Sequence, residues 1–354
     1  MSTTLDKPLS PQSLLVGRTL PRWAPAAVLA GDVALSAALF AVTPLQGRVQ
    51  FILFLAAVYV LALTVLSAVV EGKQRSRDRL ATAVTTAALI LAILPLIGVL
   101  SYTISRGLTR FDTTFFTHSM RNISAKDATG GAYHAIIGTL EQVGIATLIS
   151  VPIGLLVSIY LVEYARGRFG RLVSTFVDVM TGLPSIVAGL FVLAVWVLFL
   201  DQGYSGFAGS LALVILMVPV VVRSSEEILR LVPDALREAS YALGVPRWRT
   251  IVSIVLPTAL PGITTGVMLA IARATGETAP LLLTVFGNDA ININPFSGAQ
   301  EGLPLFVFRQ AGLPNNTALD RAWAGALTLI AFVVLLNVLA RLLIRRSVPR
   351  RGTR

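Results

Sequence analysis

Eight long apolar runs limit what this chain can fold into more than any other feature of the sequence. They cover about 24–44, 51–70, 82–104, 136–162, 173–200, 204–222, 258–286 and 322–344. A helix of about 20 apolar residues crosses the hydrocarbon core of a bilayer, and such a helix satisfies its backbone hydrogen bonds internally. Only 13% of the residues are charged, against about a quarter in soluble domains. The sequence therefore predicts an all-α, polytopic transmembrane helical bundle with about eight spans.

Basic residues between the runs predict the orientation of the chain. The net charge is +11, and Lys and Arg gather in cytoplasmic loops. If both termini are cytoplasmic, three basic stretches fall on the inner side, with Lys73, Arg75, Arg77, Arg79, Arg166, Arg168, Arg171, Arg341, Arg345, Arg346, Arg350, Arg351 and Arg354. The basic segment 105–133 then lies on the outer side. It is either an ordinary solvated loop or a loop whose positive charge attracts an anion. Membrane topology explains the basicity, so we expect no nucleic-acid partner.

Several kinds of chemistry are excluded by the residues present. The chain has no cysteine, which rules out disulfides and thiolate metal sites. The two histidines, His118 and His134, show no metal-ligand spacing, and we expect no metal. A phosphate-cradling loop G-x4-G-K-[ST] needs a lysine, and the contexts of Lys7, Lys73 and Lys126 do not fit. We therefore expect a chain that is not an enzyme and holds no cofactor, with any ATP hydrolysed by another polypeptide.

The longest polar interruption on the inner side runs from 223 to 257. Pro233 suits the start of a helix, and Gly244 ends that helix, because glycine accepts the left-handed cap conformation. The stretch "VPRWRTIVSIVLP" then predicts a second short helix, after which Pro257 lets the chain bend toward the membrane. The expected structure is two short helices joined by a glycine turn at the inner surface.

The spacing in this segment resembles the coupling-loop pattern E-A-A-x3-G-x9-I-x-L-P of ABC-importer permeases. The matching residues are Glu238, Ala239, Ser240, Gly244, Ile254, Leu256 and Pro257, and the one departure is Ser240 for the second alanine. In that family the helix–turn–helix docks on the ATPase subunit and transmits its closure to the membrane helices. The resemblance implies a type I importer permease in a bacterial inner (plasma) membrane, with Glu238, Ala239 and Gly244 docking on a separate ATPase dimer that uses the ATP.

Three further stretches narrow the resemblance. "GTLEQVGIATLISVPIGLLVSIYLVEYA", "DVMTGLPSIVAGLFVLAV" and "ARATGETAPLLLT" resemble permeases of the phosphate-specific ABC importer, and "GETAPLL" is similar to its A-type subunit. This implies a second, C-type permease and an extracytoplasmic phosphate-binding protein as partners, with membrane lipid around the chain. It also implies that the break at Gly182, Pro184 and Ser185 lies near the translocation path, although a packing kink explains that break almost as well. A sulfate or molybdate permease and an ion-coupled carrier without an ATPase remain alternatives.

The resemblance divides the chain into four regions. We expect a cytoplasmic tail at 1–22, an accessory two-span region at 23–80, a permease core at 81–346 that contains the coupling loop 223–257, and a basic cytoplasmic tail at 347–354. The family's usual six spans fit the core, and the resemblance does not explain the first two spans.

Two opposite charges lie inside the seventh run. Arg273 stands sixteen positions past Pro257, about 24 Å along a helix, and is expected near the bilayer midplane. An arginine there costs about 2.5–3.5 kcal/mol, so it should face the bundle interior or a wet cavity. Glu277 lies about one turn further and should pair with it. The pair is either a structural ion pair or part of the path, where an oxyanion competes for Arg273 and Thr275 and Thr278 donate hydroxyls.

Overall fold

The computed structural model describes residues 19–21, 23–42, 47–127, 129–165 and 167–347, without the side chains of 42, 48, 49, 53 and 343–347. The predicted tails at 1–22 and 347–354 lie almost wholly outside these residues, and so does Arg166. The orientation of the two termini is therefore not tested by the fold.

The described residues form a helical chain. Its helices are α1 (Ala24–Val42), α2 (Arg48–Val70), α3 (Lys73–Gly107), α4 (Thr113–Thr117), α5 (Tyr133–Ile159), α6 (Arg168–Thr181), α7 (Ser185–Val192), α8 (Gly206–Arg230), α9 (Asp234–Ala242), α10 (Arg247–Thr250), α11 (Leu256–Thr275), α12 (Ala279–Thr284), α13 (Leu303–Ala311) and α14 (Asn316–Ser347). Among these residues, seven helical segments are long and apolar enough to cross a membrane, or eight if the bent pair α6–α7 counts as one. The predicted all-α polytopic fold is confirmed.

The described residues separate into two compact units, which divide between Leu100 and Ser101. In the first unit α1 packs along α2, with the rings of Phe40 and Phe51 edge to face at 5.1 Å. Helix α3 runs without a break across 80/81, the predicted boundary between the accessory region and the permease core. No glycine or proline lies between its basic first turns and the apolar stretch that follows them.

A carboxylate fixes the turn between α2 and α3. Glu71 accepts hydrogen bonds from the Arg79 guanidinium at 2.8 and 3.0 Å, from the Ser67 hydroxyl at 2.6 Å and from the backbone N–H of Leu20 at 2.8 Å. Arg79 and then the other donors lower the pKa of Glu71 to about 2, since each donor favours the charged carboxylate. This turn therefore keeps its ion pair at any physiological pH.

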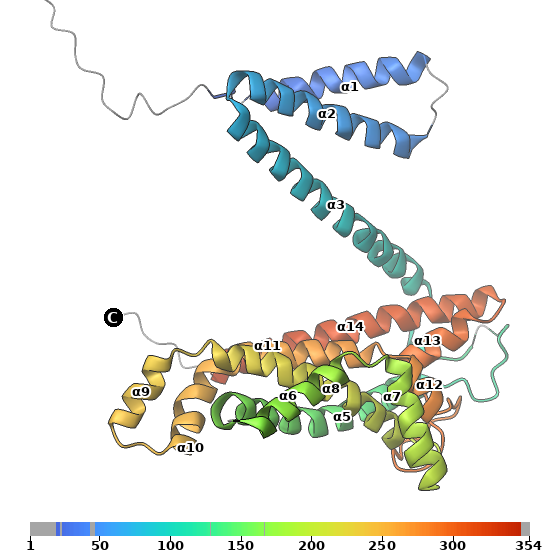
Figure 1. Cartoon of the computed structure of the whole chain (residues 1–354). Helices are drawn as coiled ribbons and strands as arrows, with labels where there is room; N and C mark the ends of the chain where they lie inside the picture. Colours follow the sequence, from blue (N-terminus) through green and yellow to red (C-terminus); the bar gives the residue numbers. More distant parts are fainter. Residues whose placement is uncertain (1–18, 22, 43–46, 128, 166, 348–354) are drawn as a thin grey trace, which may run out of the picture. The chain divides into compact units, whose positions relative to one another are not determined.

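Four long helices, α5, α8, α11 and α14, run side by side in the second unit (Figure 1). Leu213 and Met217 of α8 are fully buried at its centre. Gly154 of α5 lies against α8, where an added Cβ would stand 2.8 Å from the Cβ of Val221. Small residues at such contacts let membrane helices approach closely, and α8 becomes the central helix of the bundle.

The fifth apolar run is broken where the sequence predicted. Helix α6 ends at Thr181, α7 begins at Ser185, and their axes differ by 104°. The amide of Gly182 closes the last turn of α6 on the carbonyls of Asp178 and Val179. Pro184 cannot donate a backbone hydrogen bond to that helix, so a new helix starts beyond it.

The seventh run differs from the prediction in two ways. Residues Arg247–Thr275 form one helical segment, so the predicted bend at Pro257 is wrong. A π-helical turn at Ile251–Val255 precedes this proline. The wider hydrogen-bonded turn of a π-helix lets the helix continue past the missing N–H of Pro257 without a bend. Nor is the run one helix to its end, because α11 stops at Thr275 and α12 begins at Ala279. Pro280 in the first turn of α12 cannot continue a preceding helix.

The segment 105–133 is anchored to the bundle instead of lying free. Arg321 of α14 is fully buried and donates to the carbonyls of Ala125 at 2.9 Å, Asp127 at 2.6 Å and Thr129 at 3.4 Å. A guanidinium has five donors in a rigid fork, so one side chain can satisfy several loop carbonyls. The sequence did not indicate this role.

Candidate functional site

The segment that resembles a coupling loop has the predicted form of two helices joined by a glycine turn. Helix α9 ends at Ala242, Gly244 has φ +75°, and α10 begins at Arg247. The amides of Gly244 and Val245 donate to the carbonyls of Tyr241 and Ser240, at 2.9 and 3.2 Å. Only glycine adopts this left-handed conformation without strain, so the turn geometry depends on Gly244.

One buried ion pair fastens α9 to the membrane bundle. Arg237 donates to Oε1 of Glu163 at 3.0 Å, and Glu163 is 4% exposed. The same guanidinium donates to the carbonyls of Val232 at 2.6 Å and Leu229 at 3.0 Å. Arg237 therefore links α9 both to the π-helical end of the α5 span and to the last turn of α8. Sequence reasoning missed this pair, although Arg237 stands next to Glu238 in the motif.

The second helix is attached to the same place. The guanidinium of Arg247 donates to the backbone carbonyl of Glu163 and lies 5.1 Å from the centre of the Tyr164 ring. The hydroxyls of Ser240 and Thr250 form a buried hydrogen bond of 2.8 Å between α9 and α10. The one departure from the family pattern, Ser240, thus provides a hydrogen bond that alanine could not make.

Several large apolar side chains of the two short helices are exposed. Leu236 is 40%, Tyr241 41%, Leu243 83% and Trp248 62% exposed. Glu238 and Ala239 are exposed beside them. We call these six residues the coupling surface. Clustered exposed apolar side chains mark an interaction site.

The remaining motif residues connect this surface to the bundle. Leu256 packs with Leu229 and Val232 of the α8 end, Ile254 is half-buried, and Pro257 is exposed. Helix α10 continues into α11 as one helical segment, Arg247–Thr275, so Trp248 and Arg273 lie on the same continuous segment.

Arg273 and Glu277 are brought together, as predicted, but by a helix end. Their Nε and Oε1 atoms lie 3.7 Å apart. Arg273 is in the last turn of α11, and Glu277 is in the break before α12. The Arg273 side chain is 54% exposed and that of Glu277 17%. Arg273 therefore does not face the interior of this chain's own bundle, one of the two environments predicted for it, because it lies at a helix end and not in the middle of a continuous span. A separation of 3.7 Å is too long for a hydrogen bond, so the guanidinium keeps most of its donors available.

The two predicted threonine donors differ. Thr275 is 1% exposed and its hydroxyl donates to the Ile271 carbonyl at 2.7 Å, so its proton is already engaged. Thr278 is half-buried at the start of α12, where its side chain makes no capping hydrogen bond.

The helices beyond the two breaks pack on each other. Helices α7 and α12 lie side by side (Figure 1), and a Cβ at Gly189 would stand 2.7 Å from Cα of Pro280. Each break is followed by one of these two helices. Helix α7 follows the break at Gly182, Pro184 and Ser185, and α12 follows the break at Gly276, so the contact between α7 and α12 depends on the geometry of both breaks.

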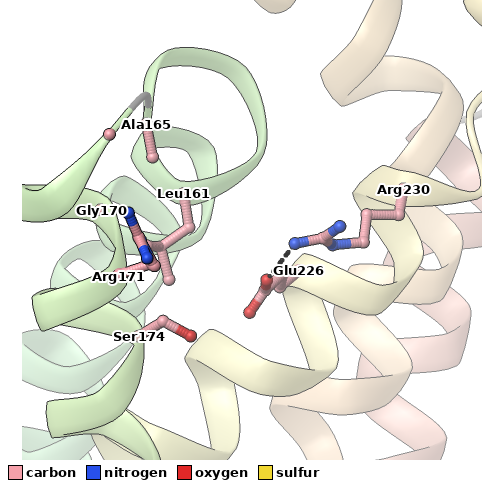
Figure 2. A pocket seen from close by; sticks show the side chains of 8 residues that line it. Leu161, Ala165, Gly170, Arg171, Ser174, Glu226 and Arg230 are labelled. Atoms are coloured by element: carbon pink, nitrogen blue, oxygen red, sulfur yellow. Dashed lines mark hydrogen bonds and ion pairs between the residues drawn. The ribbon is translucent and has the colours of Figure 1, made fainter.

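A cleft of about 390 Å³ lies between the ends of α6 and α8. Figure 2 shows Arg171 and Ser174 on one wall and Glu226 and Arg230 on the other. Glu226 accepts from Arg230 at 2.7 Å and from Arg223 at 2.5 Å. Arg223 also pairs with Asp178 at 2.5 Å, so ion pairs hold α6 to α8 beneath the cleft.

A family of membrane transport components matches most of the second unit. The model of the family "Binding-protein-dependent transport system inner membrane component" matches residues 150–352. The crystal structure of a bacterial ABC transporter involved in alginate import has a similar fold, at 15% identity and a TM-score of 0.53, over 78% of this chain and 100% of that chain.

Curated relatives make the assignment specific. The chain is 47% identical over 282 residues to the phosphate transport system permease protein PstA 1 of Mycobacterium tuberculosis, which covers 79% of this chain and 92% of that protein. It is 39% identical over 278 residues to PstA of Yersinia pestis, which covers 78% of this chain and 93% of that protein. The chain belongs to the binding-protein-dependent transport system inner membrane components, and among them to the PstA phosphate permeases. It is a multi-pass inner membrane protein.

Proposed function

We propose that the chain is the membrane-spanning A-type permease subunit of an ATP-driven phosphate importer. It forms the translocation path with a second, C-type permease. An extracytoplasmic protein delivers phosphate, and an ATPase dimer docks on the coupling surface. Both termini lie in the cytoplasm. The chain hydrolyses no ATP itself.

The coupling surface is the observation that carries this proposal. Its apolar side chains are exposed, yet Arg237 and Arg247 hold the element rigidly to the bundle. A rigid element with an apolar face suits the transfer of force from a docked partner. An ion-coupled carrier would have no use for such a face, which disfavours that alternative. A sulfate or molybdate permease would keep the same face, and relatives named for phosphate transport favour phosphate.

We expect Leu243→Asp to detach the ATPase. Leu243 is 83% exposed, and burial of a leucine contributes about 1.5–3 kcal/mol. Replacing it by a carboxylate should weaken association at least about 10-fold, since each 1.4 kcal/mol is a factor of ten. Co-purification of the ATPase and phosphate-stimulated ATP hydrolysis measure the effect.

Leu243→Met is the matched control, because it keeps the apolar contact at the same position. It should retain both association and ATP hydrolysis. If Leu243→Asp also retained them, the coupling surface would not be the docking site.

A further inference from the structure

Three side chains that can ligate a metal meet where the segment 286–302 lies against the start of α5. They are His134 in the first turn of α5, Asp289 between α12 and α13, and Glu301 just before α13. One ligand atom from each lies within 4.8 Å of the other two. In a tetrahedral site with bonds of about 2.0–2.2 Å, ligand atoms lie roughly 3.4 Å apart. Small side-chain rotations would therefore bring all three atoms to one centre.

Two of these residues are buried with polar atoms left unpaired. His134 is 2% exposed and Glu301 is 1% exposed. Neither ring nitrogen of His134, nor Oε1 of Glu301, has a hydrogen-bond partner among the described residues. Buried polar atoms in folded proteins almost always have a partner. The unpaired atoms of His134 and Glu301 belong to the same cluster, so a single bound cation would satisfy one ring nitrogen of His134 together with the Glu301 carboxylate.

Two carboxylates, those of Asp289 and Glu301, face the single guanidinium of Arg309, so the cluster has a formal charge of −1 that a bound cation would offset. Arg309 donates to Oε2 of Glu301 at 2.5 Å and lies 3.4 Å from Oδ1 of Asp289. It contacts one oxygen of each carboxylate, and Oε1 of Glu301 has no hydrogen-bond partner among the described residues.

The backbone holds the ligands in place. The Glu301 carbonyl presses on Gly138 of α5, where a Cβ would stand 1.9 Å from it, and it accepts from Gln142 at 3.3 Å. Gly287 has φ +81°, and a Cβ there would stand 3.1 Å from Oε2 of Glu301. The His134 ring packs edge to face on Phe306 at 5.7 Å. Ligands whose positions are fixed by such surroundings need little rearrangement to bind.

We propose that His134, Asp289 and Glu301 bind a divalent transition-metal cation, with Zn²⁺ the best match, and that this ion fastens the segment 286–302 to α5. One imidazole and two carboxylates form a three-ligand set that leaves a fourth position for water. Arg309 orients both carboxylates from outside the coordination sphere. The sequence pointed away from a metal because its three ligands are widely separated along the chain.

Zinc content measures this directly. The full-length chain is purified in lipid nanodiscs through an affinity tag that contains no histidine, dialysed against buffered Zn²⁺, and assayed by elemental mass spectrometry. We expect about one zinc per chain. We expect each of three variants to weaken zinc binding at least about 10-fold: His134→Gln, Glu301→Gln and Asp289→Asn. A loss of about 10-fold is usual even for residues that only hydrogen-bond to a metal ligand. Because the Asp289 side chain is 51% exposed, Asp289→Asn should fold even if the buried variants do not.

His118→Gln is the matched control. It removes the only other histidine of the chain, whose ring nitrogen contacts the Thr117 hydroxyl, and it should bind zinc like the wild type. Chelation of zinc should also increase chymotrypsin cleavage after Phe296, which is 65% exposed within the fastened segment. A wild-type chain that binds no zinc, or an Asp289→Asn chain that binds it as tightly as the wild type, would overturn the proposal.

Discussion

Arg237→Met should abolish phosphate uptake and destabilise the permease. The substitution leaves the buried carboxylate of Glu163 without its cation and removes the guanidinium donor from the carbonyls of Val232 and Leu229, of which Leu229 keeps the Val232 amide as a donor. Removing one partner of a buried ion pair costs about 3–5 kcal/mol. Helix α9 would lose its ion pair with the end of the α5 span and its contact with the end of α8, so a movement of the docked ATPase would be transmitted poorly to α5 and α8. Uptake by cells and the thermal unfolding midpoint of the purified chain measure the two effects.

Two further variants separate this explanation from a general loss of charge. Asp234→Asn changes the other acidic partner of Arg237. The Asp234 side chain is 87% exposed, and exposed ion pairs contribute about 0–1 kcal/mol to stability. It should keep both uptake and stability. Glu163→Gln in the Arg237→Met background removes the stranded charge and should restore most of the lost stability. An Arg237→Met permease with normal uptake would show that this ion pair does not serve coupling.

Arg273→Gln should reduce phosphate uptake roughly 10- to 150-fold while the complex still assembles. That range corresponds to about 1.5–3 kcal/mol for a hydrogen bond to a charged group. The Arg273 guanidinium is 54% exposed and its contact with Glu277 is 3.7 Å, so its donors are available to an oxyanion. Arg341→Gln, which changes another exposed arginine of the same unit, should leave uptake unchanged.

Glu277→Gln distinguishes the two interpretations of the Arg273–Glu277 pair. If Arg273 binds phosphate, Glu277 is its competitor, and Glu277→Gln should retain uptake or bind phosphate more tightly. If the pair only latches the helix end, both single variants should lose uptake equally. We expect the first result, because the 3.7 Å between Nε of Arg273 and Oε1 of Glu277 is too long for a hydrogen bond that would hold the helix end.

The sequence could predict those features that depend on local pattern. Long apolar runs predicted the membrane-crossing helices, and the spacing from Glu238 to Pro257 predicted two helices around a glycine turn. Gly182 and Pro184 predicted the break in the fifth run. Each of these features depends on residues close together in the chain, so their types and spacing were sufficient.

The features that were missed depend on contacts between distant segments. Arg237 and Glu163 are 74 residues apart, and no local spacing relates them. The break at Gly276 was missed because the apolar run continues on both sides of it, and hydropathy does not register a change of direction. Arg321 looked like an ordinary basic residue, because its burial depends on how the segment 105–133 packs against α14.

Transport by the assembled complex in proteoliposomes tests the central claim most directly. The chain is reconstituted with its second permease and ATPase, phosphate-binding protein is added outside, and accumulation of radiolabelled phosphate is followed with ATP sealed inside. We expect accumulation that requires ATP and the binding protein, that excess sulfate does not inhibit, and that Leu243→Asp abolishes. Accumulation driven by an ion gradient without ATP, or accumulation of sulfate in place of phosphate, would contradict the proposed function.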